Sequence, residues 1–527
     1  MRRPLPSWRH LLTTLLLAWL GQVLAGASTI DGYARDIPAE TPAARKLRHE
    51  RVAERRAGTI LLAHRGACTL ATENTLEAYA AAMDYGADGC EVDVRRTADG
   101  VFVMFHDDML DRLTDGFGEV EQLSYTDLLA LRPQLIRGTA HQRARPPTFA
   151  ALLMLARQRA MLLHLDVKRP GLDEDIARIL DETDMWDHVV AVNTETLPKL
   201  MTNPKLKLLR YKGAVYEQRL DVDPAAVRAA LAKPGQILML EDPRLAAHQL
   251  KRSAYQPVPL PREVFAEWTP APSPLQSTSA NLVPVDYLRQ LQTRTDPSSA
   301  VALLALLRTN DLKEWREPQD NPRTERRRTE RILERAWAAD RLGQTGSRSP
   351  RSIECLEFLV RHSSWHRDWI FNGLDGHTAA RALGRLRVVQ SAPALIEAFR
   401  RVDPDLIRVR NPQWTNNPLA WTDWRKMSIL PALGELKCDA ARSFLLEYVT
   451  LSETAARELS VPQFEEATTA LLRQKIGRSE ILGLIKSPNL AVRGTAILGC
   501  LDHPTRDRTA ALREAAPWAL ALPKVLR

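Results

Sequence analysis

Short runs rich in β-forming residues alternate with helical stretches between residue 58 and about residue 245, and this alternation constrains the fold more than any other feature of the chain. Strands that alternate with helices are the pattern of βα units around a parallel sheet. The sequence therefore predicts an α/β domain in this region. The β-rich runs are TILLAH (59–64), GCEVDVR (89–95), VFVMFH (101–106), AMLLHLDV (160–167), HVVAVN (188–193), LKLLRY (206–211) and QILMLE (236–241).

Two local signals support this reading of the first units. Leu76, Tyr79, Ala80 and Met83 are spaced as i, i+3, i+4 and i+7, which places them on one apolar face of a helix. The dipeptide Asp99-Gly100 separates two β-rich runs and favours a tight hairpin turn between them. The first crossover is therefore predicted to be a helix, and the second and third runs are predicted to form a hairpin.

Polar side chains stand at the predicted carboxyl ends of these strands, where barrel enzymes have their active sites. The first run ends at His64 and is followed by Arg65, and the third run ends at His106. Glu91 and Asp93 lie two residues apart on a strand, so their side chains point the same way. Two carboxylates on one face repel each other unless a cation lies between them, and oxygen ligands suit Mg²⁺ or Ca²⁺. We therefore expect a divalent-cation site here.

A further run places three polar residues on one face of a strand, namely His164, Asp166 and Lys168. Each of these elements alone has an ordinary explanation, because a single histidine or an E-x-D pair is more often a structural or solvated group. Their joint occurrence at strand ends of one βα region favours an active site.

The same residues carry a resemblance to a known family. The stretch from 60 to 131 contains the pieces HRG, ENT, GAD-x-x-E-x-D, T-x-DG, HD and L-x-R-x-T-x-G-x-G, in that order. With this order and spacing it resembles the glycerophosphodiester phosphodiesterases. The resemblance implies a (β/α)₈ TIM-type barrel and a metal-dependent enzyme that hydrolyses glycerophosphodiesters to glycerol phosphate and an alcohol.

The resemblance also implies a role for each matching residue. In that family two histidines serve as general acid and base, carboxylates hold the metal, and cationic side chains bind the phosphate. The implied roles are acid–base catalysis for His64 and His106, metal ligation for Glu91, Asp93 and Asp166, phosphate binding for Arg65 and Lys168, and support of the first catalytic loop or approach to the metal for Glu73.

The third ligand departs from the family pattern. The family usually has a glutamate in an E-x-K piece, whereas this chain has Asp166-Val167-Lys168. An aspartate is one methylene shorter, so it would reach the metal directly or through a bridging water.

The resemblance fades after about residue 206, where the aromatic strand near W-T-x-N that often ends the family's barrel cannot be placed. We therefore expect a barrel that is incomplete or closed in an unusual way. Four polar residues at later strand ends are either pocket residues or ordinary surface residues, namely Asn193, Lys212, Glu241 and Asp242.

The second half of the chain has a different character. Residues 257–295 are predicted to be a proline-rich linker. Residues 296–527 are predicted to be helical, with amphipathic segments that end near turn-forming residues and recur at irregular intervals. This pattern resembles HEAT-type helical repeats, in which neighbouring helix pairs bury each other's faces. A non-repetitive helical domain is the alternative.

The N-terminus resembles a secretory signal. Basic residues precede the apolar stretch LLTTLLLAWLGQVLA, and small residues follow it. We expect residues 1–27 to be a signal peptide, 28–57 a lead-in segment and 58–256 the barrel, with export to the periplasm or outside the cell. An uncleaved membrane anchor is the alternative.

Charge and cysteine content narrow the choice of partners. The net charge of +9 indicates a solvated basic surface or attraction to anionic lipid head groups or phosphodiesters. The five cysteines are far apart and form no CxxC pair, which argues against a zinc site or a dense disulfide framework. No nucleic-acid motif is present. We expect a small phosphodiester substrate, with an anionic lipid or a protein as the partner of the helical repeats.

Two other functions compete with the first. One is a related phosphodiesterase that resembles phosphatidylinositol-specific phospholipase C or sphingomyelinase D. The other is a non-catalytic adaptor that works through the helical repeats. The HD-x-x-L-x-R-x-T-x-G-x-G piece favours the glycerophosphodiester reading over the first alternative, and the intact His64, Glu91, Asp93 and His106 argue against the second.

Overall fold

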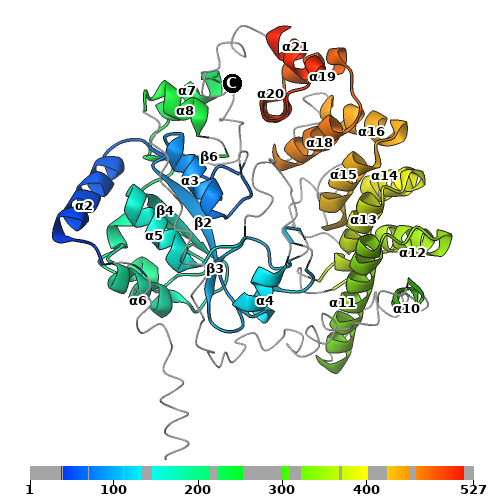
Figure 1. Ribbon diagram of the computed structural model, residues 1–527, viewed down its shortest axis with the longest axis horizontal. Coiled ribbons are helices and arrows are strands. Elements are labelled where there is room, and N and C mark those ends of the chain that lie inside the picture. Colours follow the sequence, from blue (N-terminus) through cyan, green and yellow to red (C-terminus); the bar gives the residue numbers. More distant parts are fainter. Residues whose placement is uncertain are drawn as a thin grey trace, which may run out of the picture.

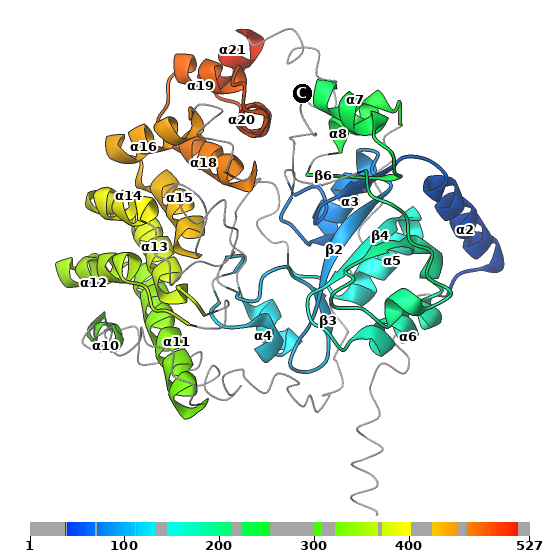
Figure 2. The same cartoon turned by 180° about the vertical axis from the view of Figure 1, so that it is seen from behind.

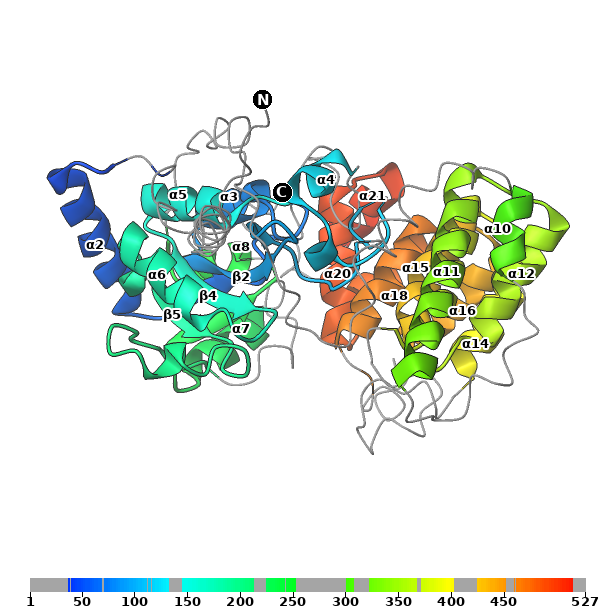
Figure 3. The same ribbon diagram turned by 90° about the horizontal axis from the view of Figure 1, so that it is seen from below.

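The computed structural model has two halves, a strand-rich half and an array of helices, which lie beside each other (Figures 1 and 3). The proposed signal peptide, the linker 257–295 and Asp242 lie outside the described residues. None of the described helices has both the length and the apolar character that a membrane span requires. The structure describes residues 37, 39–68, 71–110, 112–114, 116–131, 145–212, 224–241, 243–252, 300–307, 322–366, 371–401, 424–451, 459 and 461–514.

The strand-rich half contains a parallel sheet with one antiparallel strand. The strand order is β5-β4-β2-β1-β6, and β3 pairs with β2 in antiparallel orientation, as the Asp99-Gly100 turn predicted. Each strand overlaps a run predicted from the sequence, and β2 extends one residue beyond its predicted run. The strands are β1 (Ile60–Ala63), β2 (Gly89–Arg96), β3 (Phe102–Met104), β4 (Leu162–Val167), β5 (Val189–Val192) and β6 (Ile237–Leu240).

The segment 209–212 joins the two edges of this sheet. The Leu209 amide donates to the Val190 carbonyl of β5, and the Lys212 amide donates to the Ile237 carbonyl of β6. Tyr211 also forms a parallel bridge with Ile237. The predicted barrel-type fold is confirmed, and the described residues close it as a ring of β1, β2, β4, β5, segment 209–212 and β6. This ring is smaller than the eight strands that the family resemblance implied.

One end of the ring is covered by helix α2 (Pro42–Arg56), at the edge of the barrel farthest from the array (Figure 2). Val52 of α2 packs in one apolar cluster with Ile60, Leu162 and Ile237, which lie near the amino ends of their strands. Two arginines at the end of α2 donate to backbone carbonyls at the starts of strands. This end of the barrel is therefore closed by α2, and the predicted site residues lie at the opposite end, at the carboxyl ends of the strands.

Helices cover the outer face of the sheet. The predicted first crossover helix is α3, and the Thr75 hydroxyl caps it by accepting from the Ala78 amide. Its apolar face packs against the sheet together with α5. The helices of this half after α2 are α3 (Leu76–Asp84), α4 (Tyr125–Ala130), α5 (Phe149–Arg159), α6 (Asp173–Thr183), α7 (Pro224–Ala232) and α8 (Arg244–Gln249).

The second half is a double layer of helices, which confirms the predicted HEAT-like region. Figure 1 shows α11, α13, α15, α18 and α20 in the layer nearer the barrel, each beside the next. The helices are α10 (Ala300–Leu306), α11 (Pro322–Thr345), α12 (Pro350–Arg361), α13 (Leu374–Leu386), α14 (Ala392–Arg400), α15 (Trp424–Leu436), α16 (Asp439–Val449), α18 (Val461–Arg473), α19 (Arg478–Ile485), α20 (Leu490–Asp502) and α21 (Arg506–Glu514).

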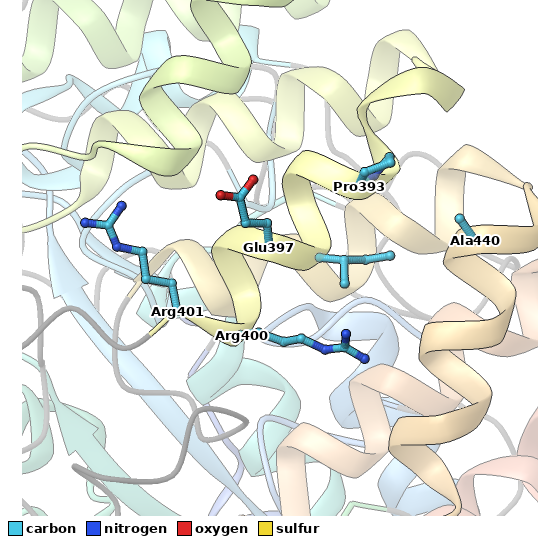
Figure 4. Close-up of a pocket in the computed structure, with 6 residues that line it drawn as sticks. Pro393, Glu397, Arg400, Arg401 and Ala440 are labelled. Carbon is cyan, nitrogen blue, oxygen red and sulfur yellow. The ribbon is translucent and has the colours of Figure 1, made fainter.

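A shallow pocket lies on the outer layer of the array, between α14 and α16 (Figure 4). Its two arginines come from the end of α14, and the Arg400 guanidinium also pairs with Glu447 at 3.0 Å. None of the residues that line it comes from the barrel. They are Pro393, Ile396, Glu397, Arg400, Arg401 and Ala440.

The two halves share one continuous apolar cluster. On the barrel side it includes Leu61 of β1, Leu240 of β6, and Met109 and Phe117 from the loop that follows β3. On the array side it runs through the helices from α10 to α21. The loop after β3 lies between the barrel and the array in Figures 1 and 2.

A ladder of glycine–alanine contacts sets the spacing of the inner helices. At three successive helix pairs, a glycine of one helix lies against an alanine of the next, so the two backbones approach closely. A β-carbon at Gly434, for example, would lie 2.9 Å from the Ala470 Cα. The pairs are Gly343 with Ala382, Gly384 with Ala432, and Gly434 with Ala470.

This ladder yields a stability prediction. We expect Gly434→Ala to destabilise the protein by about 1–3 kcal/mol, because the added methyl group forces two packed helices apart. Gly483 is a matched control on α19, where a β-carbon would have no neighbour within 4 Å. Gly483→Ala should be neutral or stabilise by up to about 1 kcal/mol, since alanine favours the helix. Urea denaturation of the full chain measures both, and equal midpoints for the two variants would contradict the prediction.

Candidate active site

The mouth of the barrel gathers the polar residues that were predicted from the sequence. They come from segments far apart in the chain, and the parallel strands bring their carboxyl ends together. The register pairs Glu91 with His164 and Asp93 with Asp166 across β2 and β4. Because alternate residues of a strand share a face, the three carboxylates point into the same space.

A cluster of carboxylates occupies the centre of this mouth. Ligand oxygens of Glu91, Asp93 and Asp166 all lie within 4.8 Å of one another. The Lys168 ammonium lies beside them, 2.5 Å from Asp93 Oδ1 and 2.6 Å from Asp166 Oδ2. Glu91 and Asp93 are buried. The sequence had predicted this set of residues, and the structure brings all four together.

The electrostatics of the pair on β2 show that the site is crowded with negative charge. Burial, and then the charge of Asp93, raise the pKa of Glu91 well above its usual range. Burial also acts to raise the pKa of Asp93, but His106, Arg65 and Lys168 outweigh it and leave that pKa lowered. The pKa values of Glu91 and Asp93 therefore differ, because the two neighbouring carboxyl groups cannot easily both be charged.

The donor set fits a divalent cation. Three carboxylates converge on one point, and hard oxygen ligands of this kind suit Mg²⁺ or Ca²⁺. The raised pKa of Glu91 marks a place where added positive charge is favourable. A bound cation would relieve the repulsion that the side chains leave uncompensated.

Two asparagines hold the carboxylates in place. The Asn74 amide donates to Asp93 Oδ2 at 2.6 Å, and its oxygen accepts from the Tyr79 hydroxyl at 2.7 Å. Asn74 adopts a left-handed backbone conformation with φ of 55°. The Asn193 amide donates to Asp166 Oδ1 at 2.8 Å. The sequence analysis missed Asn74, although it stands in the ENT piece, and left the role of Asn193 open.

Arg65 lies at the edge of the carboxylate cluster. Its backbone amide donates to Glu91 Oε2 at 2.9 Å, and its guanidinium pairs with Glu73 at 3.0 Å. The Nε atom lies 3.5 Å from Asp93 Oδ2 and makes no hydrogen bond within the described part of the chain. Gly66 follows in a left-handed conformation, where a β-carbon would collide with the Ala78 backbone at 2.7 Å. The HRG turn therefore needs its glycine.

The second histidine has its own carboxylate partner. His106 Nδ1 lies 2.7 Å from Asp107 Oδ1, and Arg112 bonds both Asp107 and Glu73. Glu73 thus supports the cationic side chains and is not part of the carboxylate cluster. Burial, together with the charge of Arg65, lowers the pKa of His106 despite the carboxylates nearby.

The first histidine pairs with a residue from the last strand. His64 Nδ1 lies 2.8 Å from Glu241 Oε1. Burial acts to lower the pKa of His64, but the charge of Glu241 outweighs it and the pKa is raised. Lys212 does not join the site, since its Nζ donates to the Lys233 carbonyl at 3.1 Å. Of the four later residues weighed from the sequence, Asn193 and Glu241 therefore belong to this mouth.

A tyrosine and a histidine contact each other beside the carboxylates. The Tyr211 hydroxyl and His164 Nδ1 are 2.5 Å apart, and the two rings meet edge to face. Burial lowers the pKa of His164 to about 4, so the ring is neutral near pH 7. His164 therefore adds no positive charge to the site.

The barrel and the polar mouth at its carboxyl end define an enzyme of the α/β-barrel class. The glycerophosphoryl diester phosphodiesterase family model matches residues 64–215, and a PBS lyase HEAT-like repeat model matches residues 377–401. A glycerophosphodiester phosphodiesterase from Caldanaerobacter subterraneus is 31% identical over 167 residues, which are 30% of this chain and 69% of that protein. The chain belongs to the glycerophosphodiester phosphodiesterase family.

The chain is also similar to a second curated protein and to a solved structure. A probable glycerophosphodiester phosphodiesterase 1 from Mycobacterium tuberculosis is 40% identical over 172 residues, which are 32% of this chain and 55% of that protein. A solved glycerophosphodiester phosphodiesterase from Agrobacterium tumefaciens is 22% identical and matches 36% of this chain and 99% of its own, with a TM-score of 0.31. Several curated relatives are matched over only about half of their length.

The crowded carboxylates predict an unusual stability effect. We expect Glu91→Gln to stabilise the metal-free protein at about pH 9 and to have little effect at about pH 4. The reason is that the raised pKa of Glu91 makes its charged form unfavourable in the folded state, and this cost appears only as pH rises above the unfolded pKa, about 4.3. Urea denaturation in the presence of a chelator measures it.

The exposed Glu195 provides a matched control, because Glu195→Gln removes the same charge at the surface. A saturating divalent cation should reduce the difference in stability, since binding at 100 times the Kd adds about 2.7 kcal/mol to the protein that binds it. A Glu91→Gln variant that is less stable than the wild type at the higher pH without metal would contradict the prediction.

Proposed function

We propose that this protein hydrolyses glycerophosphodiesters to glycerol phosphate and an alcohol, with a divalent cation bound at the barrel mouth. The observation that carries the proposal is the meeting of two carboxylate-paired histidines, three clustered carboxylates and two cationic side chains in one mouth of a chain of this family. Each group has a task in the cleavage of a phosphodiester.

The cation would be held by Glu91, Asp93 and Asp166. When bound, it supplies positive charge to the phosphate oxygens as negative charge builds on them. Arg65 and Lys168 flank the same carboxylates and bring two further positive charges to that place. A phosphate would also give the Arg65 Nε atom a hydrogen-bond acceptor.

The two histidines divide the proton transfers between them. The carboxylate of Glu241 raises the pKa of His64, which suits the protonated acid that serves the leaving alcohol. Burial and Arg65 lower the pKa of His106, which suits the neutral base that takes the proton of the nucleophile. Groups whose environments separate their pKa values in this way are suited to opposite roles. The nucleophile is a water molecule or a neighbouring hydroxyl of the substrate, which would give a cyclic phosphate first.

The proposal predicts metal-dependent turnover. We expect the wild-type protein to release glycerol phosphate from members of a glycerophosphodiester panel with Mg²⁺ or Ca²⁺, and not with a chelator. His106→Ala should reduce kcat by about 10²–10⁴-fold, because the base is lost, while leaving the fold and the cation affinity intact. Phosphate-product assays and calorimetric cation titration measure the two effects separately, and detection of a cyclic product identifies the nucleophile.

Other outcomes would point to other functions. Turnover of a phospholipid or sphingomyelin, with none of the panel, would favour the related phospholipase-type activity. A folded protein that neither binds a cation nor hydrolyses any phosphodiester would favour an adaptor that works through the helical array. Unchanged kcat in His106→Ala would reject the proposed site.

We also propose that the protein is exported and that its leader is removed after Ala27. The support is the basic start, the apolar stretch and the small residues that follow it. Mass spectrometry of the protein recovered from its native host should find a mature chain that begins at Ser28. An intact N-terminus in the membrane fraction would instead favour the anchor.

A further inference from the structure

We infer that Glu241 is a positioning residue, which orients His64 through its imidazole Nδ1 and is itself held by the thiol of Cys68. This inference rests on the proposed function and deepens it. Glu241 follows β6, 177 positions after His64 in the chain. The pairing of β1 with β6 brings the two residues together.

The pairing of β1 with β6 makes them neighbours. The register sets Ala63 opposite Leu240, and the His64 amide donates to the Leu240 carbonyl at 2.8 Å. The first residue after each strand is therefore His64 on one side and Glu241 on the other. His64 Nδ1 and Glu241 Oε1 are 2.8 Å apart, a hydrogen-bond distance. The hydrogen-bonded backbones of β1 and β6 therefore hold the two side chains next to each other.

This contact fixes the chemistry of the imidazole. A ring that donates its Nδ1 proton to a carboxylate keeps Nε2 for the substrate, and the ring is held in one orientation. The charged groups that face His64 are Glu241, Arg65 and Glu91, with His164 nearby. Glu241 is the one of them that hydrogen-bonds the ring in the described residues, and its negative charge favours the imidazolium.

The second oxygen of Glu241 is also engaged. The Cys68 thiol donates to Glu241 Oε2 at 2.5 Å, and Cys68 lies just beyond the HRG turn, where its amide donates to the Gly66 carbonyl. Both carboxylate oxygens are thus held by residues of the first catalytic loop. A carboxylate bound at both oxygens keeps one rotamer, so it can position the ring.

The two histidines differ in what holds their carboxylates. Asp107, the partner of His106, shares its charge with the Arg112 guanidinium. Glu241, the partner of His64, accepts a hydrogen bond from the Cys68 thiol. A carboxylate that is hydrogen-bonded to a histidine ring favours the protonated form of that ring. Asp107 is the sequence neighbour of the histidine that it contacts, whereas Glu241 reaches His64 from a different strand.

The test is Glu241→Gln, an isosteric change that removes only the charge, compared with Glu174→Gln as a control. Glu174 is an exposed glutamate whose only recorded partner in the described residues is Lys199. We expect Glu241→Gln to lower kcat by about 10²-fold with KM and cation affinity within about threefold of the wild type. The high-pH limb of the kcat profile should move to lower pH by about 1–3 pH units, because His64 loses its proton earlier.

A second readout separates this inference from the proposed function. The titration of the His64 ring, followed by NMR and assigned with a His64→Gln variant, should shift to lower pH in Glu241→Gln, whether or not any substrate is turned over. In Cys68→Ala it should not shift down, because the charge of Glu241 remains. An unchanged His64 titration in Glu241→Gln, or an equal fall in Cys68→Ala, would overturn the positioning role. A wild-type protein without turnover would instead reject the proposed function alone.

Discussion

The crowding of Glu91, Asp93 and Asp166 at one point is the constraint around which the barrel mouth is organised. Three carboxylates within 4.8 Å of one another repel strongly in a buried site, so the surrounding residues must hold them against that repulsion. Asn74 and Asn193 each donate a hydrogen bond to one carboxylate, and Lys168 and Arg65 bring positive charge. The clustered carboxylates thus provide negative charge where a cation would bind, and Arg65 and Lys168 provide positive charge for a phosphate.

The order of the strands decides which residues meet at this mouth. The carboxylates lie together because they come from the adjacent strands β2 and β4. The position of β6 beside β1 adds Glu241 to the mouth and gives His64 a partner. The contact between His64 and Glu241 therefore depends on the pairing of two strands that are far apart in the sequence. The carboxylate cluster depends on the pairing of β2 with β4, in the first half of the barrel.

This difference explains what could be predicted from the sequence. The strands, the hairpin and the residues of the cluster could be predicted from local patterns. A short segment of sequence is enough to show which residues alternate along a strand and which ones lie at its carboxyl end. Glu241 could not be assigned, because nothing in a short run says which strand will lie beside β1. Asn74 was missed for another reason. An asparagine is common in turns because it tolerates the left-handed backbone conformation, so its presence suggests a turn and not a site residue. Its hydrogen bond to Asp93 forms only in the folded protein.

The apolar cluster that runs from Leu61 and Phe117 into the helical array has a mechanical consequence. The loop that holds Phe117 also carries Arg112, which ties together Asp107 and Glu73. A loosening of the array's helices would therefore reach this loop and the strands β1 and β6, because Leu61 and Leu240 belong to the same cluster. The helical array thus supports the part of the barrel from which His64, Arg112 and Glu241 come.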